Sequence, residues 1–325
     1  MSTQVMTVTG PISSNELGFT LPHEHIYLDL MRDRFHINNF LNDTEMAESE
    51  VRRYARAGGK TLVDLTSGGL KGIDQDLPFD AELNLLKHPK AVRAMAEKTG
   101  LNIVLGCGWY RESYYEPRLW KMKTEEMTEE IVRDLTEGID GTDVRAGIIG
   151  EIGAHFNRLS SIEERVLRAA GRAQVKTGVG LVTHATMGPH GLDQLDVLLQ
   201  EGVDPRRVAI AHSGAFPIHK YHAEIARRGA YVSFDRMGML PIFNEFERSR
   251  TLRLIKMIID VGHIDNLLLS HDVCYRSDYA MNGGAGYDYL STQGMAILGG
   301  EIGLTEEQFH SIMYDNPRRL LTGED

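Results

Sequence analysis

The feature that most constrains the fold is an alternation of short apolar runs with helical segments, repeated eight times along the chain. Runs rich in β-branched or apolar residues, followed by glycine and polar residues, are typical of buried parallel strands. The predicted strands are Gly18–His25, Thr61–Thr66, Asn102–Gly108, Gly147–Gly153, Gly180–Ala185, Arg207–Gly214, Tyr231–Gly238 and Asn266–Val273. Eight strand–helix units in 325 residues favour a closed (β/α)8 barrel over an open, doubly wound sheet.

The segments between the runs carry helix signals, and three of them are clear: Thr44–Ala57, Pro89–Thr99 and Ile162–Thr177. The first begins at a threonine suited to capping, and all three are followed directly by glycine. No linker rich in proline, serine or charge divides the chain, so we expect residues 1–325 to form one α/β domain. The longer connections, 26–43, 110–124 and 275–293, each follow a strand and belong to the face where barrel active sites are built.

Composition excludes several classes of partner. The formal net charge is −11, which argues against a nucleic acid or an anionic membrane surface and favours a small-molecule substrate. Only Cys107 and Cys274 are present, so no disulfide framework is needed and a reducing cytoplasm fits. The N-terminus does not resemble a signal peptide, and no apolar run is long enough to predict a membrane span.

Metal-ligand residues gather at the C-terminal ends of the predicted strands. They are His23, His25, Glu151, His184, His212 and Asp272. Residues two apart in a strand point to the same face, so His23 and His25 can both enter the barrel while Glu24 points away, as His271 should beside Asp272. A lone histidine near a strand end is more often a packing residue. Six such groups on five strands instead indicate a centre for two divalent ions, with His155 as an outer group.

The order of these motifs resembles the phosphotriesterase family of the amidohydrolase superfamily along nearly the whole chain. The motifs are Gly10-Pro11, Leu17–Thr20 leading into His23-Glu24-His25, Thr183-His184, Ala211–Ser213, Ser270–Asp272 and Asn316–Leu320. The resemblance implies a (β/α)8 hydrolase with a binuclear site that is usually zinc, although manganese, cobalt and iron suit the same ligands. It places His23, His25 and Asp272 on a buried metal, and His184 and His212 on a more exposed one.

Many members of that family bridge the two metals with a carbamylated lysine on the fourth strand. This chain has Glu151 there, within Gly150-Glu151-Ile152-Gly153, and none of the eight strand runs contains lysine. A carboxylate supplies the same charge and the same two oxygens, but it is shorter. Some branches of the family carry glutamate here, one of them with the same Gly-Glu-Ile-Gly run, so we expect Glu151 to be the bridge.

The lactonase branch of the family provides the expected reaction. Asp235-Arg236 is similar to an Asp-Arg run of that branch, and Tyr110 matches a tyrosine that lactonases place beside the exposed metal. The resemblance therefore implies that a hydroxide between the metals attacks a lactone or carboxylic ester. Asp272 would accept its proton, Tyr110 would donate a hydrogen bond to the substrate, and Arg236 would orient it.

Three arginines, Arg111, Arg236 and Arg276, follow the third, seventh and eighth strands within a few residues. On an acidic protein, guanidinium groups at one rim suggest that the substrate carries a carboxylate or phosphate. The alternative is that they pair with neighbouring acids such as Glu112, Asp235 and Asp278. Trp109 is a further candidate substrate contact, or else it packs with Tyr110 as a loop aromatic pair.

Three other functions stay open. One is a phosphotriester or phosphodiester hydrolase, which Arg236 disfavours. The second is an amidase on N-acyl compounds, because the glutamate-bridged branch includes such chemistry by resemblance. The third is a ligand-binding barrel that retains its metals without turnover. A homodimer is common in the family.

Overall fold

The computed structural model describes residues 3–71, 88–154, 156, 158–186 and 188–324, and it confirms the predicted barrel. Eight parallel strands form one sheet in the order β12-β11-β10-β9-β8-β7-β6-β3. They are β3 (Thr20–Glu24), β6 (Thr61–Asp64), β7 (Asn102–Cys107), β8 (Ile148–Gly153), β9 (Gly180–His184), β10 (Val208–Ala211), β11 (Tyr231–Phe234) and β12 (Leu267–Leu269). Each strand lies within one of the eight runs expected from the sequence.

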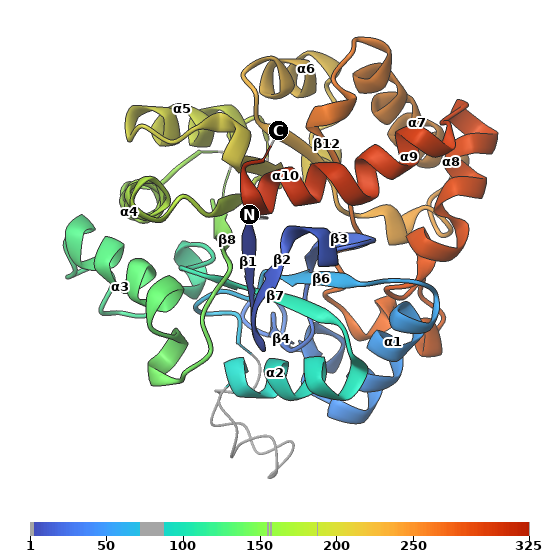
Figure 1. Cartoon of the computed structure of the whole chain (residues 1–325). Coiled ribbons are helices and arrows are strands. Elements are labelled where there is room, and N and C mark those ends of the chain that lie inside the picture. Colours follow the sequence, from blue (N-terminus) through green and yellow to red (C-terminus); the bar gives the residue numbers. More distant parts are fainter. Residues whose placement is uncertain (1–2, 72–87, 155, 157, 187, 325) are drawn as a thin grey trace.

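Helices surround the strands (Figure 1). They are α1 (Thr44–Arg56), α2 (His88–Thr99), α3 (Thr124–Thr136), α4 (Ser161–Thr177), α5 (Gly191–Gln200), α6 (His219–Arg227), α7 (Glu245–Asp260), α8 (Met295–Ile302), α9 (Glu306–His310) and α10 (Asn316–Thr322). The expected cap of α1 is wrong by one residue. The side chain of Asp43 accepts from the backbone N–H of Met46 at 3.0 Å, so Thr44 is the first helical residue. No helix in the described part of the chain is long and apolar enough to cross a bilayer.

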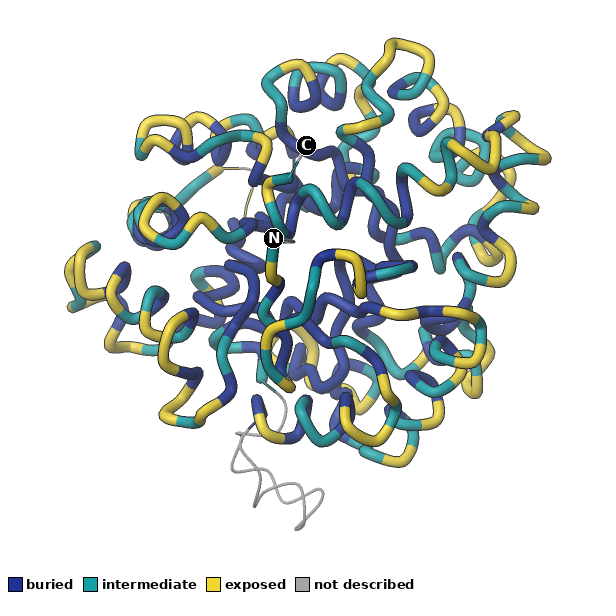
Figure 2. Tube along the Cα trace, viewed as in Figure 1, coloured by how far each residue is buried: buried dark blue, intermediate teal, exposed yellow. Residues whose placement is uncertain are grey.

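Two apolar layers hold the barrel together, and Figure 2 shows the buried strands at the centre with exposed positions on the outer helices. Alternate residues along a strand serve the two layers: on β7, Val104 belongs to the interior cluster, while Ile103 packs outward against the helices. One end of the interior is closed by Val5 of β1 (Gln4–Thr7) and by Leu320 of α10. β1 pairs with β2 (Gly10–Ser13) as an antiparallel hairpin. The functional residues are therefore confined to the opposite end.

The seam between the first and last strands is joined largely through one buried carboxylate, Glu24. Its Oε1 accepts from Ser270 Oγ and from the N–H of His271, both at 2.8 Å, and its Oε2 accepts from the N–H of Val273 at 2.9 Å. The N–H of Asp272 donates to the carbonyl of His23 at 3.2 Å. The chain after β12 is thus fixed on the end of β3, which places Asp272 beside His23.

The connection after β3 contains a small antiparallel ribbon, β4 (Leu28–Asp29) with β5 (Phe40–Leu41). Its backbone reaches the segment after β12, since Nε of Arg276 donates to the carbonyl of Phe40 at 2.8 Å. This ribbon carries Asp33 between its strands, on the same side of the barrel as the strand ends.

Replacement of Asp134 on α3 should stabilise the protein in a pH-dependent way. Burial raises the pKa of this carboxyl to about 7, although the Lys71 ammonium opposes the shift. Between about pH 4, where an unfolded aspartate ionises, and pH 7, the unfolded chain loses a proton that the folded chain keeps, so stability falls as pH rises. Asp134→Asn should therefore raise the free energy of unfolding by on the order of 2 kcal/mol at pH 8 and by almost nothing near pH 4.

Urea unfolding at the two pH values measures this difference. Asp260→Asn, at an exposed position of α7, is the control and should change stability by less than about 0.5 kcal/mol at either pH. An equal gain in unfolding free energy for Asp134→Asn at both pH values would contradict the raised pKa of Asp134.

Candidate metal centre

The structure brings together all six residues that the sequence predicts as metal ligands. His23 lies on β3, Glu151 on β8 and His184 on β9, while the others follow the ends of β3, β10 and β12. All six are buried at the end of the barrel opposite β1. His155, the expected outer group, lies outside the described residues.

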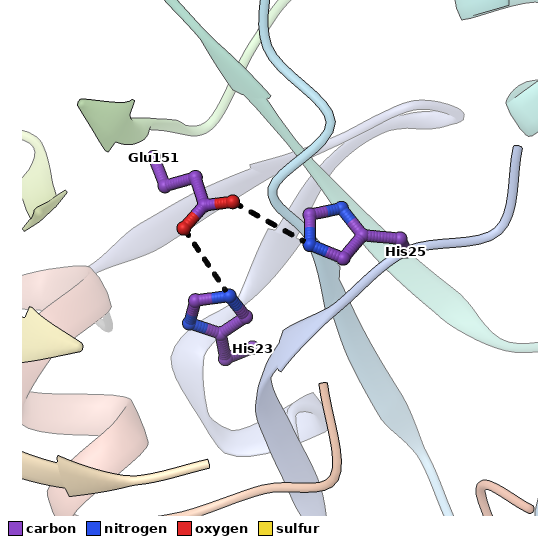
Figure 3. A group of neighbouring side chains, drawn as sticks. All are labelled: His23, His25 and Glu151. Carbon is purple, nitrogen blue, oxygen red and sulfur yellow. Dashed lines mark ion pairs between the residues drawn. The ribbon is translucent and has the colours of Figure 1, made fainter. Parts of the chain in front are cut away.

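The first group of candidate ligands consists of His23, His25 and Glu151 (Figure 3). Each histidine points its Nε2 at a different oxygen of Glu151, at 3.6 Å in both cases. Asp272 Oδ1 completes the group, 3.3 Å from His25 Nε2 and 3.7 Å from His23 Nε2. Two ligands of a tetrahedral ion at about 2.0–2.1 Å are about 3.3 Å apart, so these separations suit side chains that share one cation.

His23 provides independent support for a cation. Its side chain is buried, and neither ring nitrogen has a hydrogen-bond partner among the described residues. A buried polar atom without a partner lowers the stability of the folded protein by about 1–3 kcal/mol, and a bound cation would remove that penalty.

The second group consists of Glu151, His184 and His212. Glu151 Oε2 lies 2.9 Å from His184 Nδ1 and 3.3 Å from His212 Nε2, and these two nitrogens are 2.8 Å apart. Glu151 is therefore common to both groups. Its Oε1 faces His25, while its Oε2 faces His23 and the second group.

The backbone around these side chains is unusual. Gly150 has φ 132°, and a Cβ at this position would lie 2.5 Å from the carbonyl oxygen of Val182, so only glycine fits before Glu151. His212 and Asp272 have φ values of 56° and 49°, in the left-handed region where histidine and aspartate are tolerated better than most residues. Backbone strain of this kind is concentrated at functional sites.

The electrostatics of the centre keep Glu151 ionised and His184 neutral. Burial lowers the pKa of His184 to about 4, so its imidazole is neutral at physiological pH. Burial alone would raise the pKa of Glu151, but His184 and His212 outweigh it and hold that pKa well below its usual range. Metal ligation requires neutral imidazoles and ionised carboxylates, and Glu151 and His184 meet that requirement. Burial would lower the pKa of His212 and of His25, but the neighbouring carboxylates outweigh it and raise both pKa values, so these two imidazoles would release a proton when a cation binds.

Outer contacts orient the histidines, and the sequence did not single these partners out. Asp235 accepts from the backbone N–H of His212 at 2.7 Å and lies 2.9 Å from its Nδ1, which leaves Nε2 facing Glu151. Thr66 Oγ1 lies 3.0 Å from His25 Nδ1 in the same way. A carboxylate behind a metal-binding histidine fixes its tautomer and orientation. The one available signal was the position of Asp235 at the end of the seventh run.

Removal of this carboxylate should weaken metal binding. Asp235→Ala leaves His212 free to rotate, and we expect divalent-ion affinity to fall by about 10- to 100-fold, measured by competition with a chelator. Ser233→Ala is the matched control, because it removes only a hydroxyl that donates to the same carboxylate at 3.1 Å. Unchanged affinity in Asp235→Ala would refute the orienting role.

A cavity of about 460 Å³ opens over the metal centre. Among the predicted substrate contacts, Tyr110, Arg111 and Arg236 line it, together with His25, Glu151, His184, His212 and Asp272. The hydroxyl of Tyr110 lies 3.3 Å from His184 Nε2. Burial raises the pKa of this phenol well above its usual value, so it keeps its proton at neutral pH.

Trp109 and Arg276, two of the expected substrate contacts, do not line this cavity. Trp109 is buried in the outer layer, with the Arg118 guanidinium 5.8 Å from its ring. Arg276 turns toward the β4–β5 ribbon, where it donates to Phe40 O and to Asn42 Oδ1 at 2.9 Å. Both were predicted from closeness in sequence to a strand end, which does not determine the direction of a side chain after the strand.

The two predicted arginines that line the cavity, Arg111 and Arg236, are paired with acids. Arg111 contacts Asp33 at 2.5 Å, and Arg236 contacts Asp272 at 3.3 Å and Asp278 at 3.5 Å. Of the acids proposed as alternative partners, Asp278 pairs with Arg236. Sequence reasoning also missed a third arginine in the cavity wall, Arg250 of α7, because it lies mid-helix and far from any strand end.

Comparisons with known proteins agree with this geometry. The model of the phosphotriesterase family matches residues 3–321. The phosphotriesterase homology protein of Escherichia coli (strain K12) is 28% identical over 309 residues, covering 95% of this chain and 99% of that protein. The N-acetyltaurine hydrolase of Salmo salar is 26% identical over 361 residues, covering 99% of both. The crystal structure of a resiniferatoxin-binding protein from Rhodobacter sphaeroides superimposes with a TM-score of 0.87 at 29% identity, covering 98% of this chain and 95% of that one.

Proposed function

The chain belongs to the phosphotriesterase family, and on this premise we propose that it is a hydrolase with two divalent cations that share Glu151. His23, His25 and Asp272 hold one cation, and His184 and His212 hold the other. Zinc is the first expected ion, and manganese, cobalt and iron suit the same donors. The observation that carries the proposal is the contact of one buried carboxylate with four histidines at 2.9–3.6 Å.

The proposed reaction is hydrolysis of a lactone or carboxylic ester. When bound, the two ions lower the pKa of a water molecule and polarise the carbonyl oxygen of the substrate. A cavity of about 460 Å³ lies within the range of small-molecule sites.

Three side chains of this protein would carry the other roles in the proposed reaction: Asp272, Arg236 and Tyr110. Burial would raise the pKa of Asp272, but its contacts with His25 and Arg236 outweigh burial and lower that pKa, so the carboxylate is ionised at neutral pH. In the proposed reaction this ionised carboxylate is the proton acceptor. Nη1 of Arg236 donates to the carbonyl of Asp272 at 2.6 Å and holds this residue in place. The protonated Tyr110 hydroxyl donates a hydrogen bond to the substrate oxygen.

A second candidate reaction is hydrolysis of an N-acyl amide. It is favoured by the relatives named N-acetyltaurine hydrolase, which match over 98–99% of this chain. The same metal centre serves both reactions, because an amide and an ester present the same carbonyl to it. A phosphotriester substrate is the third candidate, and a barrel that binds a ligand without turnover is the non-enzymatic one.

A turnover screen distinguishes these candidates. Zinc- and manganese-loaded protein is assayed with sugar lactones, fatty lactones, phosphotriesters and N-acyl amino acids, and chelator-treated protein is the control. We expect the highest kcat/KM with a lactone. A higher value with an N-acyl compound would replace the first reaction by the second. Binding without turnover of any compound would overturn the enzymatic proposal.

A further inference from the structure

Arg250 differs from the other two arginines of the cavity in having no acidic partner among the described residues. It lies on α7 and lines the same cavity as the metal ligands. Within the described residues it forms no ion pair, and its buried Nε has no hydrogen-bond partner. Arg111 and Arg236 are both neutralised by carboxylates. Arg250 is thus an uncompensated cation facing a cavity in a protein of net charge −11.

The acids nearest to Arg250 along α7 are engaged elsewhere. Glu247 accepts from the N–H of Asn244 at the start of the helix at 3.3 Å, and Glu245 accepts from Ser249 Oγ at 2.8 Å. The guanidinium of Arg250 lies over the ring of Phe246, one turn earlier on the helix, at 5.8 Å from the ring centre. Stacking on an aromatic ring restricts the side chain without neutralising it, so its charge remains available to a ligand.

We propose that Arg250 selects substrates that carry an anionic group, a carboxylate or sulfonate, on the part of the molecule remote from the bond that is cleaved. The inference rests on the proposed hydrolase function, since it assigns the two ends of the substrate to two parts of one cavity. The acyl carbonyl lies at the metal centre and the anion lies at Arg250. The planar guanidinium matches a carboxylate or sulfonate with two parallel hydrogen bonds, which satisfies the buried Nε.

The kinetic test uses matched substrates. An N-acyl amino acid or a carboxylated lactone is compared with its methyl ester in the native enzyme and in Arg250→Met. We expect KM for the anionic compound to rise by about 10-fold or more, with kcat and the neutral compound unaffected and with partial rescue in Arg250→Lys. Arg253→Met, at an exposed position of the same helix, is the control and should alter neither compound. Equal effects of Arg250→Met on both compounds would overturn the proposal.

A binding test separates this inference from the proposed function. Calorimetry with hexane-1-sulfonate and hexan-1-ol measures the anion preference without turnover. The native protein should bind the sulfonate about 10-fold more tightly than Arg250→Met does, and the alcohol equally. That result in a protein without hydrolytic activity would uphold the anion subsite and reject the hydrolase. Turnover with no dependence of sulfonate binding on Arg250 would reject the subsite alone.

Discussion

A Glu151→Ala variant is expected to lose both bound cations together, and its kcat/KM should fall by about 10³-fold or more. Glu151 is the one side chain that belongs to both groups of ligands. Its removal leaves the buried histidine nitrogens of both groups without the carboxylate that they share. The two ions should therefore leave together rather than one at a time.

The measurement is the number of metal ions per chain by plasma emission spectrometry, followed by steady-state kinetics on the best substrate. Glu151→Gln tests the charge alone, because the amide keeps the size and one acceptor, and it should retain less metal than the native protein. Glu129→Ala, on the exposed face of α3, is the control for a lost surface glutamate. Retention of the native metal content or activity in Glu151→Ala would reject the shared-carboxylate centre.

The largest effect on stability is expected at Glu24. Its carboxylate is inaccessible to solvent and accepts four hydrogen bonds from the segment after β12, including one with His271 Nδ1 at 3.1 Å. In Glu24→Gln an amide NH2 replaces one accepting oxygen and opposes backbone N–H donors. Loss of a buried charge from such a network destabilises a protein by about 3–5 kcal/mol.

Urea unfolding of the metal-loaded and chelated protein measures this loss. Glu137→Gln, at an exposed position, is the control and should change stability by less than about 0.5 kcal/mol. Because Glu24 also positions the backbone around Asp272, we expect weaker metal binding in Glu24→Gln as well. Native stability in this variant would falsify the role of Glu24 in joining the first and last strands of the barrel.

Local patterns were sufficient for the architecture. A strand of four to six residues buries nearly all its side chains in a parallel barrel, so the eight apolar runs identify the strands whatever surrounds them. The two-residue spacing of His23 and His25 follows from the pleat of a strand, and its meaning depends on no other segment. The ligands at the other strand ends were predictable because parallel strands bring their C-terminal ends to one edge.

The contacts around that edge depend on segments far apart in the chain. Asp33 pairs with Arg111, which lies 78 residues away in the sequence. The carbonyl of Phe40 binds the guanidinium of Arg276, which lies 236 residues away in the sequence, outside the cavity. No residue pattern near either arginine signals its partner, which is why Arg276 was wrongly expected at the cavity.

The sequence by itself determined the barrel, the convergence of six candidate ligands and the glutamate in place of lysine, because each follows from the periodicity of a strand or the chemistry of a side chain. Three features were decided by the tertiary structure alone. They are the hydrogen bonds by which Glu24 joins the first and last strands, the orientation of His212 by Asp235, and which arginine of the cavity has no carboxylate partner among the described residues. Arg250 faces the cavity with no acidic partner in the described part of the chain, because α7 directs it there while the acids nearest to it on the helix are engaged elsewhere. Charge compensation is a property of distances between side chains, and those distances exist only in the folded chain.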